Sequence, residues 1–467
     1  MALTAEQLRE LREVAGGANL LTAPEDCWAY GYDNSRLHAL PDAVAFATDH
    51  EQVCRIVRWC YKHRVPLTPR GRGTGTTGAA VPIRGGLVLS MERMNRIIEL
   101  RPADRFVRVE PGITNQALQD ALAEVGFFWP PDPTSAAFCT VGGNLAYNSA
   151  GPRAVKYGTP RENTLGLTAV TGTGETIRTG VRTTKGVVGL DLTRLLIGSE
   201  GTLAVITEAT LKLTPLPEEI RTLRAWYRDV ESAARAVSTI MAQPTVPRAL
   251  EFMDDAALEL IREAGVPGIP AEADALLLID VDGPASCIAP ALEAVESAAR
   301  VPGHLAVETA PDAEKAEALW AARRALSPAL RRAAPDKINE DVVVPVSAVP
   351  ALVGELRRLA RYHNLSVVNF GHIGNGNLHV NILYDAADRD AARRARRCLN
   401  EVFDTVLRLQ GTLSGEHGVG LVKQPYVRRE IHGAEARLME RIQMVFDPGG
   451  LLGRAHTPTP RPAHQQR

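Results

Sequence analysis

The sequence PRGRGTGTTGAAVP at residues 69–82 contains three glycines in the spacing G-x-G-x-x-G, at Gly73, Gly75 and Gly78. In a dinucleotide-binding fold the third glycine of this pattern opens a helix, and the N-terminus of that helix holds the pyrophosphate. Here Pro82, a Gly-Gly pair and the apolar run LVLS follow instead, so the context is strand, loop, strand. The pattern therefore does not predict a Rossmann fold.

The same loop does not fit an ATP-binding P-loop. Ala79 and Ala80 stand where a P-loop carries a lysine and a hydroxyl residue, so neither the phosphate-binding amine nor the magnesium-binding hydroxyl is present. What remains is a run of backbone N–H groups with little side-chain bulk, which can fold as a concave nest around a diphosphate. A flexible glycine and threonine loop is the alternative. Two further segments rich in small and hydroxyl residues, at 132–151 and 196–206, favour the nest.

Length and composition describe a globular chain of more than one domain. The chain of 467 residues is longer than a typical single domain with one hydrophobic core. Hydrophobic residues make up 45% of it and charged residues 23%. The formal net charge of -1 gives no reason to expect nucleic acid as the partner. Six cysteines without a C-x-x-C pair argue against a zinc ribbon, a thioredoxin-like site or an iron–sulfur cluster, and are expected to be buried thiols.

No segment indicates a membrane span or a secretory signal. No apolar run reaches about 18 residues, and the N-terminus MALTAEQLRE has no basic region leading into an apolar one. The sequence therefore predicts a cytoplasmic protein without an integral membrane segment, and leaves a peripheral association with the membrane open.

The order of elements predicts two α+β domains. Thr4 and Thr48 are expected to cap helices, and the second of these helices lies in a β-α-β unit that leads into the glycine loop. Short β runs then complete a glycine-rich α+β domain at residues 1–217. Alanine- and arginine-rich helices alternate with single strands in residues 218–456, which predicts an antiparallel sheet covered by helices and a C-terminal segment returning to the first domain. Residues 457–467 are expected to be a disordered tail.

A second constellation lies in the C-terminal half. GHIGNGNLH places His372 and His379 seven residues apart, an odd spacing that would put them on opposite faces of a continuous strand. The glycines between them permit a turn, which can bring both imidazoles to one point. SGEHGVG adds Glu416 and His417. Each histidine alone is more often structural, but two histidines and a carboxylate are a usual ligand set for a catalytic divalent ion.

The three small-residue segments resemble the FAD-binding domain of the vanillyl-alcohol oxidase and p-cresol methylhydroxylase type of flavoprotein. The resemblance implies a two-lobed FAD-binding domain in which the first segment wraps the diphosphate, the second lines the ribityl chain and isoalloxazine, and the third lies beside the adenine half. Members with covalent flavin often carry a histidine where Thr74 stands, so non-covalent FAD is implied. The implied FAD contacts are Arg70, Gly71, Gly73, Thr74, Gly75, Pro133, Thr134, Ser135, Gly142, Asn144, Asn148, Gly151, Glu200, Gly201 and Ile206.

The C-terminal half is similar to the D-2-hydroxy-acid dehydrogenase branch, which holds FAD-linked D-lactate dehydrogenases, D-2-hydroxyglutarate dehydrogenases and the flavin subunit of glycolate oxidase. Its pattern GHxGDGNxH appears here with Asn375 in place of the aspartate, whereas its C-terminal Asn-Pro-Gly is replaced by residues 453–455, to which no role is assigned. The implied divalent ion is zinc or manganese. The implied roles are metal ligation by His372, His379 and Glu416, proton abstraction by His417, and a further catalytic role for Asn377.

Two more segments, LWAARRALSP at 319–328 and DKINED at 336–341, resemble those that bind the substrate carboxylate. They imply Arg323, Ser327 and Lys337 as carboxylate-binding residues, with Arg324 as the alternative in a shifted register. The alternative is that these residues belong to an arginine-rich helix face that is exposed to solvent and binds no substrate.

The expected function is oxidation of a D-2-hydroxy acid, of the D-lactate, glycolate or D-2-hydroxyglutarate class, to the 2-oxo acid by hydride transfer to flavin N5. The alternatives are a non-redox transferase of the alkylglycerone-phosphate synthase kind, a metal-dependent hydrolase without flavin, and a flavin-fold subunit of a larger complex such as a multi-chain glycolate oxidase. The electron acceptor stays open among a quinone, a cytochrome, an electron-transfer flavoprotein and an iron–sulfur subunit. Because the chain has no cysteine cluster, an iron–sulfur relay would lie on another chain.

Overall fold

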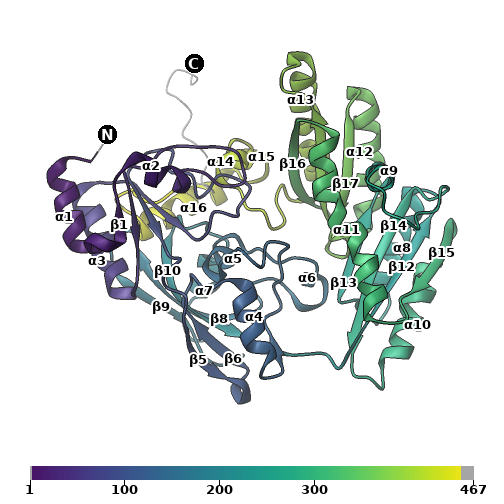
Figure 1. The fold of residues 1–467 in the computed structure, drawn as a ribbon, viewed down its shortest axis with the longest axis horizontal. Coiled ribbons are helices and arrows are strands. Elements are labelled where there is room, and N and C mark those ends of the chain that lie inside the picture. Colours follow the sequence, from purple (N-terminus) through teal and green to yellow (C-terminus); the bar gives the residue numbers. More distant parts are fainter. Residues whose placement is uncertain (1–2, 454–467) are drawn as a thin grey trace. The chain divides into compact units, whose positions relative to one another are not determined.

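The structure is a computed structural model that describes residues 3–453, drawn in Figure 1. The described chain forms two compact units. The first is built from the chain up to Ala150, from Gly158–Leu216 and from Glu416 onward, and the second from Gly151–Tyr157 and Pro217–Gly415. The tail expected at residues 457–467 lies outside the described residues.

The first unit contains the predicted β-α-β arrangement. Its four-stranded sheet has the order β1-β2-β4-β3, and β2 and β3 both pair with β4 in parallel. Helix α3 (His50–His63) connects β2 to β3, and its Val53, Ile56 and Val57 are buried in the core of this lobe. The strands are β1 (Leu20–Leu21), β2 (Ala43–Phe46), β3 (Leu67–Arg70) and β4 (Leu87–Ser90). The glycine loop joins two strands, as the sequence predicted, and these two strands are parallel.

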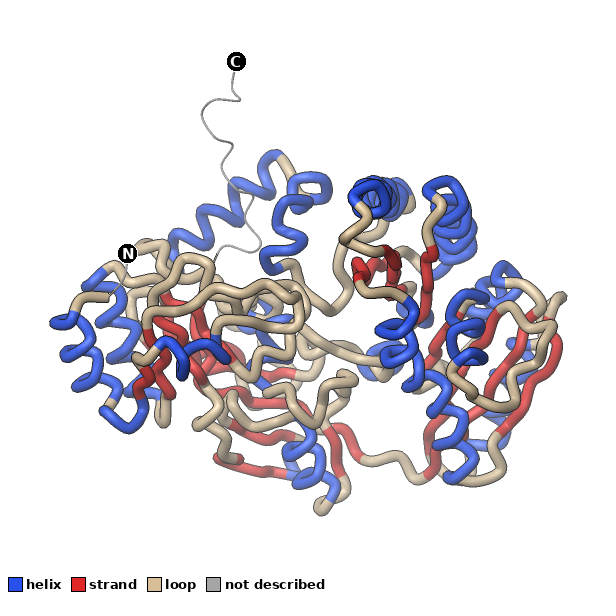
Figure 2. The backbone as a smooth tube through the Cα atoms, turned by 45° about the horizontal axis from the view of Figure 1, so that its top comes forward, coloured by secondary structure: helices blue, strands red, loops and turns tan. Residues whose placement is uncertain are grey.

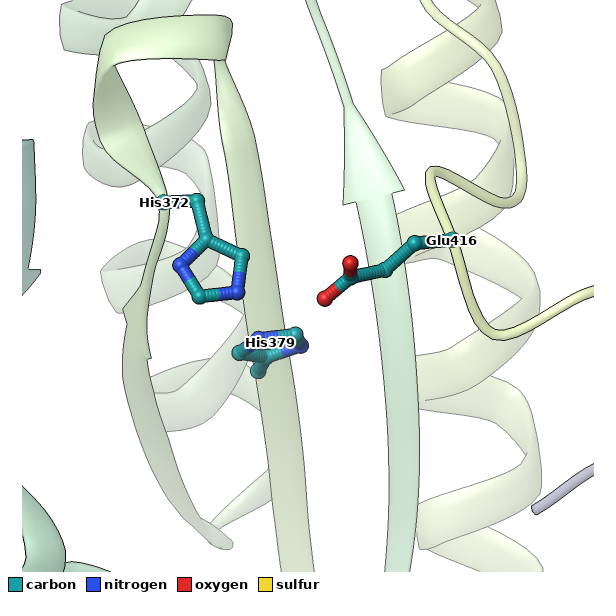
Figure 3. Close-up of side chains that lie close together, drawn as sticks. All are labelled: His372, His379 and Glu416. Carbon is teal, nitrogen blue, oxygen red and sulfur yellow. The ribbon is translucent and has the colours of Figure 1, made fainter. Parts of the chain in front are cut away.

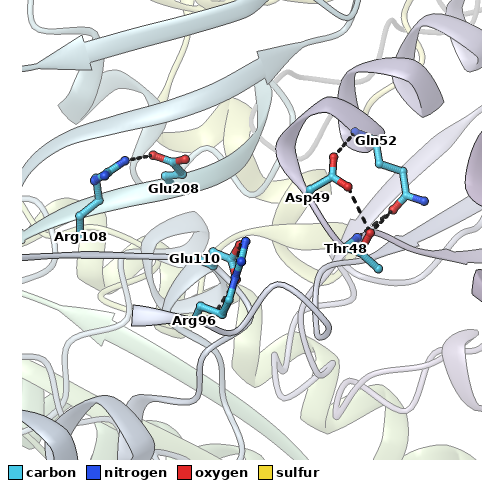
Figure 4. Close-up of polar contacts among 7 residues, drawn as sticks. All are labelled: Thr48, Asp49, Gln52, Arg96, Arg108, Glu110 and Glu208. Carbon is cyan, nitrogen blue, oxygen red and sulfur yellow. Dashed lines mark hydrogen bonds and ion pairs between the residues drawn. The ribbon is translucent and has the colours of Figure 1, made fainter. Parts of the chain in front are cut away.

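Helix starts follow the expected capping chemistry with one correction. Helix α1 (Ala5–Ala15) begins at Thr4, whose hydroxyl accepts from the Gln7 N–H, and it packs against α3 (His50–His63) (Figure 1). The predicted cap of α3 at Thr48 is wrong. Asp49 caps this helix instead, accepting from the Gln52 N–H at 2.8 Å, while the Thr48 N–H donates to the Gln52 side chain (Figure 4). Both residue types cap well, and the helix starts one residue later than predicted.

The second lobe of the first unit is a five-stranded antiparallel sheet of order β5-β6-β10-β8-β9. Arg108 on β6 donates to Glu208 on β10 at 3.0 Å, and Arg96 donates to Glu110 at 2.8 Å (Figure 4). Helix α5 (Val141–Tyr147) buries apolar residues in the core of this lobe. The strands are β5 (Ile97–Arg101), β6 (Phe106–Val109), β8 (Thr164–Thr171), β9 (Thr176–Gly180) and β10 (Ala204–Lys212).

The second unit is a seven-stranded antiparallel sheet covered by helices, as predicted, with the order β15-β12-β14-β13-β17-β18-β16. Figure 2 shows its strands in red with the helices in blue along them. Helices α9 (Asp255–Glu263) and α11 (Ala313–Ala333) share a core with Trp226, Met253 and Phe370. The strands are β12 (Glu219–Tyr227), β13 (Ala249–Met253), β14 (Ala275–Gly283), β15 (His304–Thr309), β16 (Asp336–Val343), β17 (Ser366–Gly371) and β18 (Asn377–Tyr384). The other long helices are α8 (Val230–Ala242), α10 (Ile288–Ala299), α12 (Val349–His363) and α13 (Arg389–Arg408).

The cysteines lie mostly in the interior of the two units. All six cysteines are free thiols, and five are buried as expected, but Cys287 is exposed. Helix α16 (Gly433–Phe446) ends where the Asp-Pro-Gly-Gly sequence begins. Within residues 3–453, no helix is both long enough and apolar enough to cross a membrane.

Candidate active site

A tight turn brings the two predicted histidines together. Strand β17 ends at Gly371 and β18 begins at Asn377, with a single 3-10 turn, η5 (Ile373–Asn375), between them. Gly376 adopts φ +75°, and a Cβ there would lie 1.8 Å from the carbonyl oxygen of Val344, so only glycine fits. As a result the rings of His372 and His379 lie edge to face with their centroids 5.2 Å apart.

His372 is oriented by a buried carboxylate that the sequence analysis missed. Its Nδ1 forms a short hydrogen bond with Glu251 on the neighbouring strand β13. The other oxygen of Glu251 accepts from Nε of Arg323 on α11 at 2.8 Å. Burial alone would raise the pKa of Glu251, but His372 and Arg323 outweigh it and lower the pKa to about 2. Glu251 is therefore an ionised acceptor shared by two predicted site residues.

Glu416 completes a possible ligand group. Ligand atoms of His372, His379 and Glu416 all lie within 4.8 Å of one another, and Figure 3 shows the carboxylate pointing toward the imidazoles. The loop before Glu416 is anchored in the second unit, because Ser414 Oγ and the Gly415 N–H donate to the carboxylate of Asp341 at 3.1 and 2.8 Å.

The donor chemistry of this group fits a divalent ion. Zinc and manganese both accept imidazole nitrogen and carboxylate oxygen. With Nδ1 of His372 engaged by Glu251, Nε2 would be the atom that binds a metal, which is the usual arrangement in metal-binding histidines.

Asn377 lies directly beside the turn and is 5% exposed. Its Nδ2 donates to the Val342 carbonyl at 3.2 Å, while its buried Oδ1 accepts no hydrogen bond from the described residues. A buried oxygen of this kind is costly unless a ligand or water satisfies it. The catalytic role of Asn377 stays a prediction.

The predicted carboxylate-binding residues occupy different surroundings. Arg323 packs over the Phe370 ring, and among the described residues its Nη groups donate to no protein acceptor. Arg324, the alternative, forms an exposed ion pair with Glu317. Ser327 is exposed one helical turn after Arg323. Lys337 lies four residues before Asp341 on β16, and Asp341 pairs with His379, so Lys337 shares the sheet face of that histidine.

The three small-residue segments of the first unit meet at the glycine loop. A Cβ on Gly71 would lie 2.4 Å from Thr140 Oγ1, and one on Gly75 would lie 2.5 Å from the Tyr147 hydroxyl. A Cβ on Gly201 would lie 3.3 Å from the Pro69 ring. The first segment thus packs closely against the second and third at these glycines.

The backbone N–H groups of the glycine loop fit a diphosphate. In the part of the chain that the structure describes, none of the backbone N–H groups from Arg72 to Thr77 donates a hydrogen bond to another protein atom. The next N–H, that of Gly78, is held by the buried carboxylate of Asp33, and the Gly75 carbonyl accepts from the Asn34 N–H. Segment 33–34, which the sequence analysis missed, thereby fixes the loop while leaving consecutive donors for an anion.

Other predicted FAD contacts make internal hydrogen bonds. The guanidinium of Arg70 is buried, which lowers its pKa, and donates to the Tyr32 carbonyl at 2.7 Å. Glu200 accepts from the N–H groups of Val419 and Gly420, and Asn148 accepts from the Arg161 N–H at 3.1 Å. These side chains brace the loops, and their contact with FAD stays a prediction.

The remaining predicted FAD contacts lie on α5, on β10 and in the loops between the elements. Asn144 lies on α5, and its Oδ1 accepts from Nδ2 of Asn115 at 3.1 Å. Gly142 packs in α5 against Pro111, and Ile206 lies on β10. Gly73 and Thr74 lie in the loop, whereas Gly151 belongs to the second unit. Pro133, Thr134 and Ser135 form the turn before α5.

A search of solved structures places this fold in a known class. The crystal structure of p-cresol methylhydroxylase with substrate bound matches with a TM-score of 0.76 and 18% identity, covering 98% of both chains. At this identity the likeness defines the fold alone. The chain thus has the two-domain fold of the p-cresol methylhydroxylase class of flavoproteins.

Sequence comparisons define the family. The FAD binding domain family matches residues 41–180, and the family of FAD linked oxidases, C-terminal domain, matches residues 216–456. The glycolate oxidase subunit GlcD of Bacillus subtilis (strain 168) is 38% identical over 96% of both chains. The D-2-hydroxyglutarate dehydrogenase of Xanthomonas citri pv. viticola is 34% identical and the D-lactate dehydrogenase of Anaerostipes hadrus is 32% identical, each over 96% of both chains. The chain belongs to the FAD-linked oxidase family and is an FAD-dependent oxidoreductase.

Proposed function

We propose that this enzyme oxidises a small D-2-hydroxy acid to the 2-oxo acid with non-covalently bound FAD and a divalent zinc or manganese ion. The observation that carries the proposal is the grouping of His372, His379 and Glu416 in a fold whose relatives are named for glycolate, D-lactate and D-2-hydroxyglutarate. A flavin-free hydrolase would leave the glycine nest without a role. A transferase is disfavoured by these relatives.

The residues of the chain divide the chemistry between them. Arg323 and Lys337 bind the substrate carboxylate and so orient the bond to the α-hydrogen. Asn377 offers its buried oxygen to the substrate, and His417 accepts the hydroxyl proton, as histidine most often does in general base catalysis. The N–H groups from Arg72 to Thr77 hold the diphosphate. FAD, when bound, accepts the electrons and the α-hydrogen, and a divalent ion, when bound, makes the hydroxyl more acidic.

One spectroscopic experiment tests the function. Under anaerobic conditions, we expect the flavin absorption of the purified enzyme to bleach on addition of D-lactate, glycolate or D-2-hydroxyglutarate. The L enantiomers serve as controls. A flavin that none of these acids bleaches would contradict the proposed substrate class. Because the Bacillus relative is named a subunit, we further propose that a partner chain takes up the electrons, so a dye acceptor is used in steady-state assays.

The state of the flavin is a separate prediction. Because Thr74 stands where a covalent attachment would require a histidine, we expect acid precipitation to release all of the yellow chromophore into the supernatant. The measurement is the absorbance of supernatant and pellet, and a heat-denatured sample serves as the control. Colour that stays with the pellet would show a covalent bond, and a colourless purified protein would contradict the assignment of the glycine loop.

A charge substitution tests carboxylate binding. We expect Arg323→Gln to weaken substrate binding by about ten- to a hundredfold, because a charge-assisted hydrogen bond contributes about 1.5–3 kcal/mol. The dissociation constant is obtained from the perturbation of the flavin spectrum by the product 2-oxo acid. Lys337→Gln should behave similarly. Arg324→Gln is the matched control, since its partner Glu317 is exposed, and it should bind as the wild type does.

FAD content separates this role from a structural one. All three variants should retain full flavin occupancy, measured as the ratio of flavin to protein absorbance. Loss of flavin with normal product binding would assign Arg323 to the architecture of the protein. A hundredfold loss in Arg324→Gln would show that the register is shifted by one residue.

A further inference from the structure

Glu251 occupies a position in the second unit that no comparison assigns. It lies on β13 with 1% of its surface exposed, in the apolar run Ala249–Met253. One carboxylate oxygen accepts from Nδ1 of His372, and the other accepts from Nε of Arg323. Each oxygen therefore accepts from a different residue, one directly after the neighbouring strand β17 and one on α11.

The arrangement has consequences for both partners. Because Nδ1 of His372 carries its hydrogen toward Glu251, the Nε2 lone pair faces away from β13, and the imidazole cannot turn without breaking a buried charge-assisted bond. Arg323 is held by Nε alone, which leaves the Nη end of the guanidinium to bind another anion. The buried carboxylate of Glu251 thus orients both Nε2 of His372 and the Nη groups of Arg323.

We propose that Glu251 is a positioning residue that couples binding of a divalent ion at His372 to binding of the substrate carboxylate at Arg323. The inference rests on the proposed function of these two residues and adds the link between them. Since both partners are held by the same rigid group, a change at one end alters the geometry at the other, and the coupling acts in both directions. A carboxylate that only stabilised the fold would not produce such coupling.

A partly buried carboxylate of the same sheet provides a control. Asp280 on β14 is in the same sheet and also uses its carboxylate to join the sheet to α11, because Oδ1 accepts from Thr222 Oγ1 at 2.6 Å and from Trp320 Nε1 at 3.1 Å. Its donors are neutral, and neither belongs to the predicted site. Asp280→Asn therefore reports the effect of altering a partly buried strand-to-helix hydrogen bond alone.

The experiment measures metal affinity rather than activity. Zinc and manganese dissociation constants of the FAD-loaded protein are determined by competition with a chromophoric chelator. We expect Glu251→Gln to weaken metal binding by about 10- to 100-fold, the usual effect of removing the hydrogen-bond partner of a ligating histidine. Glu251→Asp, which keeps the charge but shortens the side chain, should lose less, and it carries the test if Glu251→Gln does not fold. Asp280→Asn should bind metal as the wild type does.

Coupling is tested with Arg323, which is not itself a ligand. We expect Arg323→Gln to change metal affinity several-fold in the wild-type background and to have no further effect in the Glu251→Gln background. Equal metal affinity of Glu251→Gln and wild type, or fully additive effects of the two substitutions, would overturn the coupling and leave the proposed function intact. A wild-type protein that binds neither metal would overturn both. Thermal unfolding of each variant shows that the affinities refer to folded protein.

Discussion

Dialysis of the purified enzyme against a chelator is expected to abolish flavin reduction by a D-2-hydroxy acid while the spectrum of the oxidised flavin stays unchanged. The reason is that His372, His379 and Glu416 form the predicted ligand group, whereas the N–H groups that we assign to the diphosphate lie in the glycine loop. Lewis acid assistance of about 4 kcal/mol corresponds to roughly a thousandfold in rate. Stopped-flow absorbance under anaerobic conditions measures the loss, and added zinc or manganese should restore the rate.

Two histidine substitutions make the result specific. His379→Ala should remain inactive after metal is added back. His363→Gln is the control, because this buried histidine on α12 bonds to Glu401 through Nε2 at 2.9 Å and belongs to no predicted site. If the chelated wild-type enzyme reduced its flavin at the full rate, metal assistance would be wrong, and the two site histidines would have to act as structural or substrate-binding residues.

Local chemistry in the sequence was sufficient to predict the main features of both loops. Pro82 and the glycines after Gly78 exclude a helix, and the structure has a loop between parallel strands there. Likewise Gly374 and Gly376 predict the turn that brings His372 near His379. Glycine determines backbone conformation at its own position, so such features can be inferred without knowing the fold.

Contacts between distant strands could not be predicted in this way. Glu251 lies 121 residues before His372, and they meet only because β13 pairs with β17. Asp341 accepts from Ser414, which lies 73 residues later in the sequence. A carboxylate inside the apolar run ALEFM was the available signal, since a buried charge requires partners. The sequence could indicate that partners exist, but their identity depends on strand order.

Backbone hydrogen bonds hold the segment around His417, which makes this residue a suitable test of the proposed base. The carbonyl of His417 accepts from Thr77 Oγ1 at 3.2 Å, and the carboxylate of Glu200 accepts from the N–H groups of Val419 and Gly420. Replacing the side chain with one of similar polarity should therefore remove a proton acceptor without displacing the loop. The neighbouring Glu416 should keep its place, because the loop before it is held by Asp341.

His417→Asn is accordingly expected to slow flavin reduction by about 10²–10⁴, the usual contribution of a positioned general base, while metal and flavin contents stay at wild-type values. The rate is measured by anaerobic stopped flow at saturating substrate, with both enantiomers of lactate and of 2-hydroxyglutarate and with glycolate. His432→Asn, an exposed histidine before α16, is the control and should leave the rate unchanged. Loss of metal from His417→Asn would make this residue a ligand instead. A wild-type rate would mean that another group takes the hydroxyl proton, because every 2-hydroxy acid must lose that proton on oxidation.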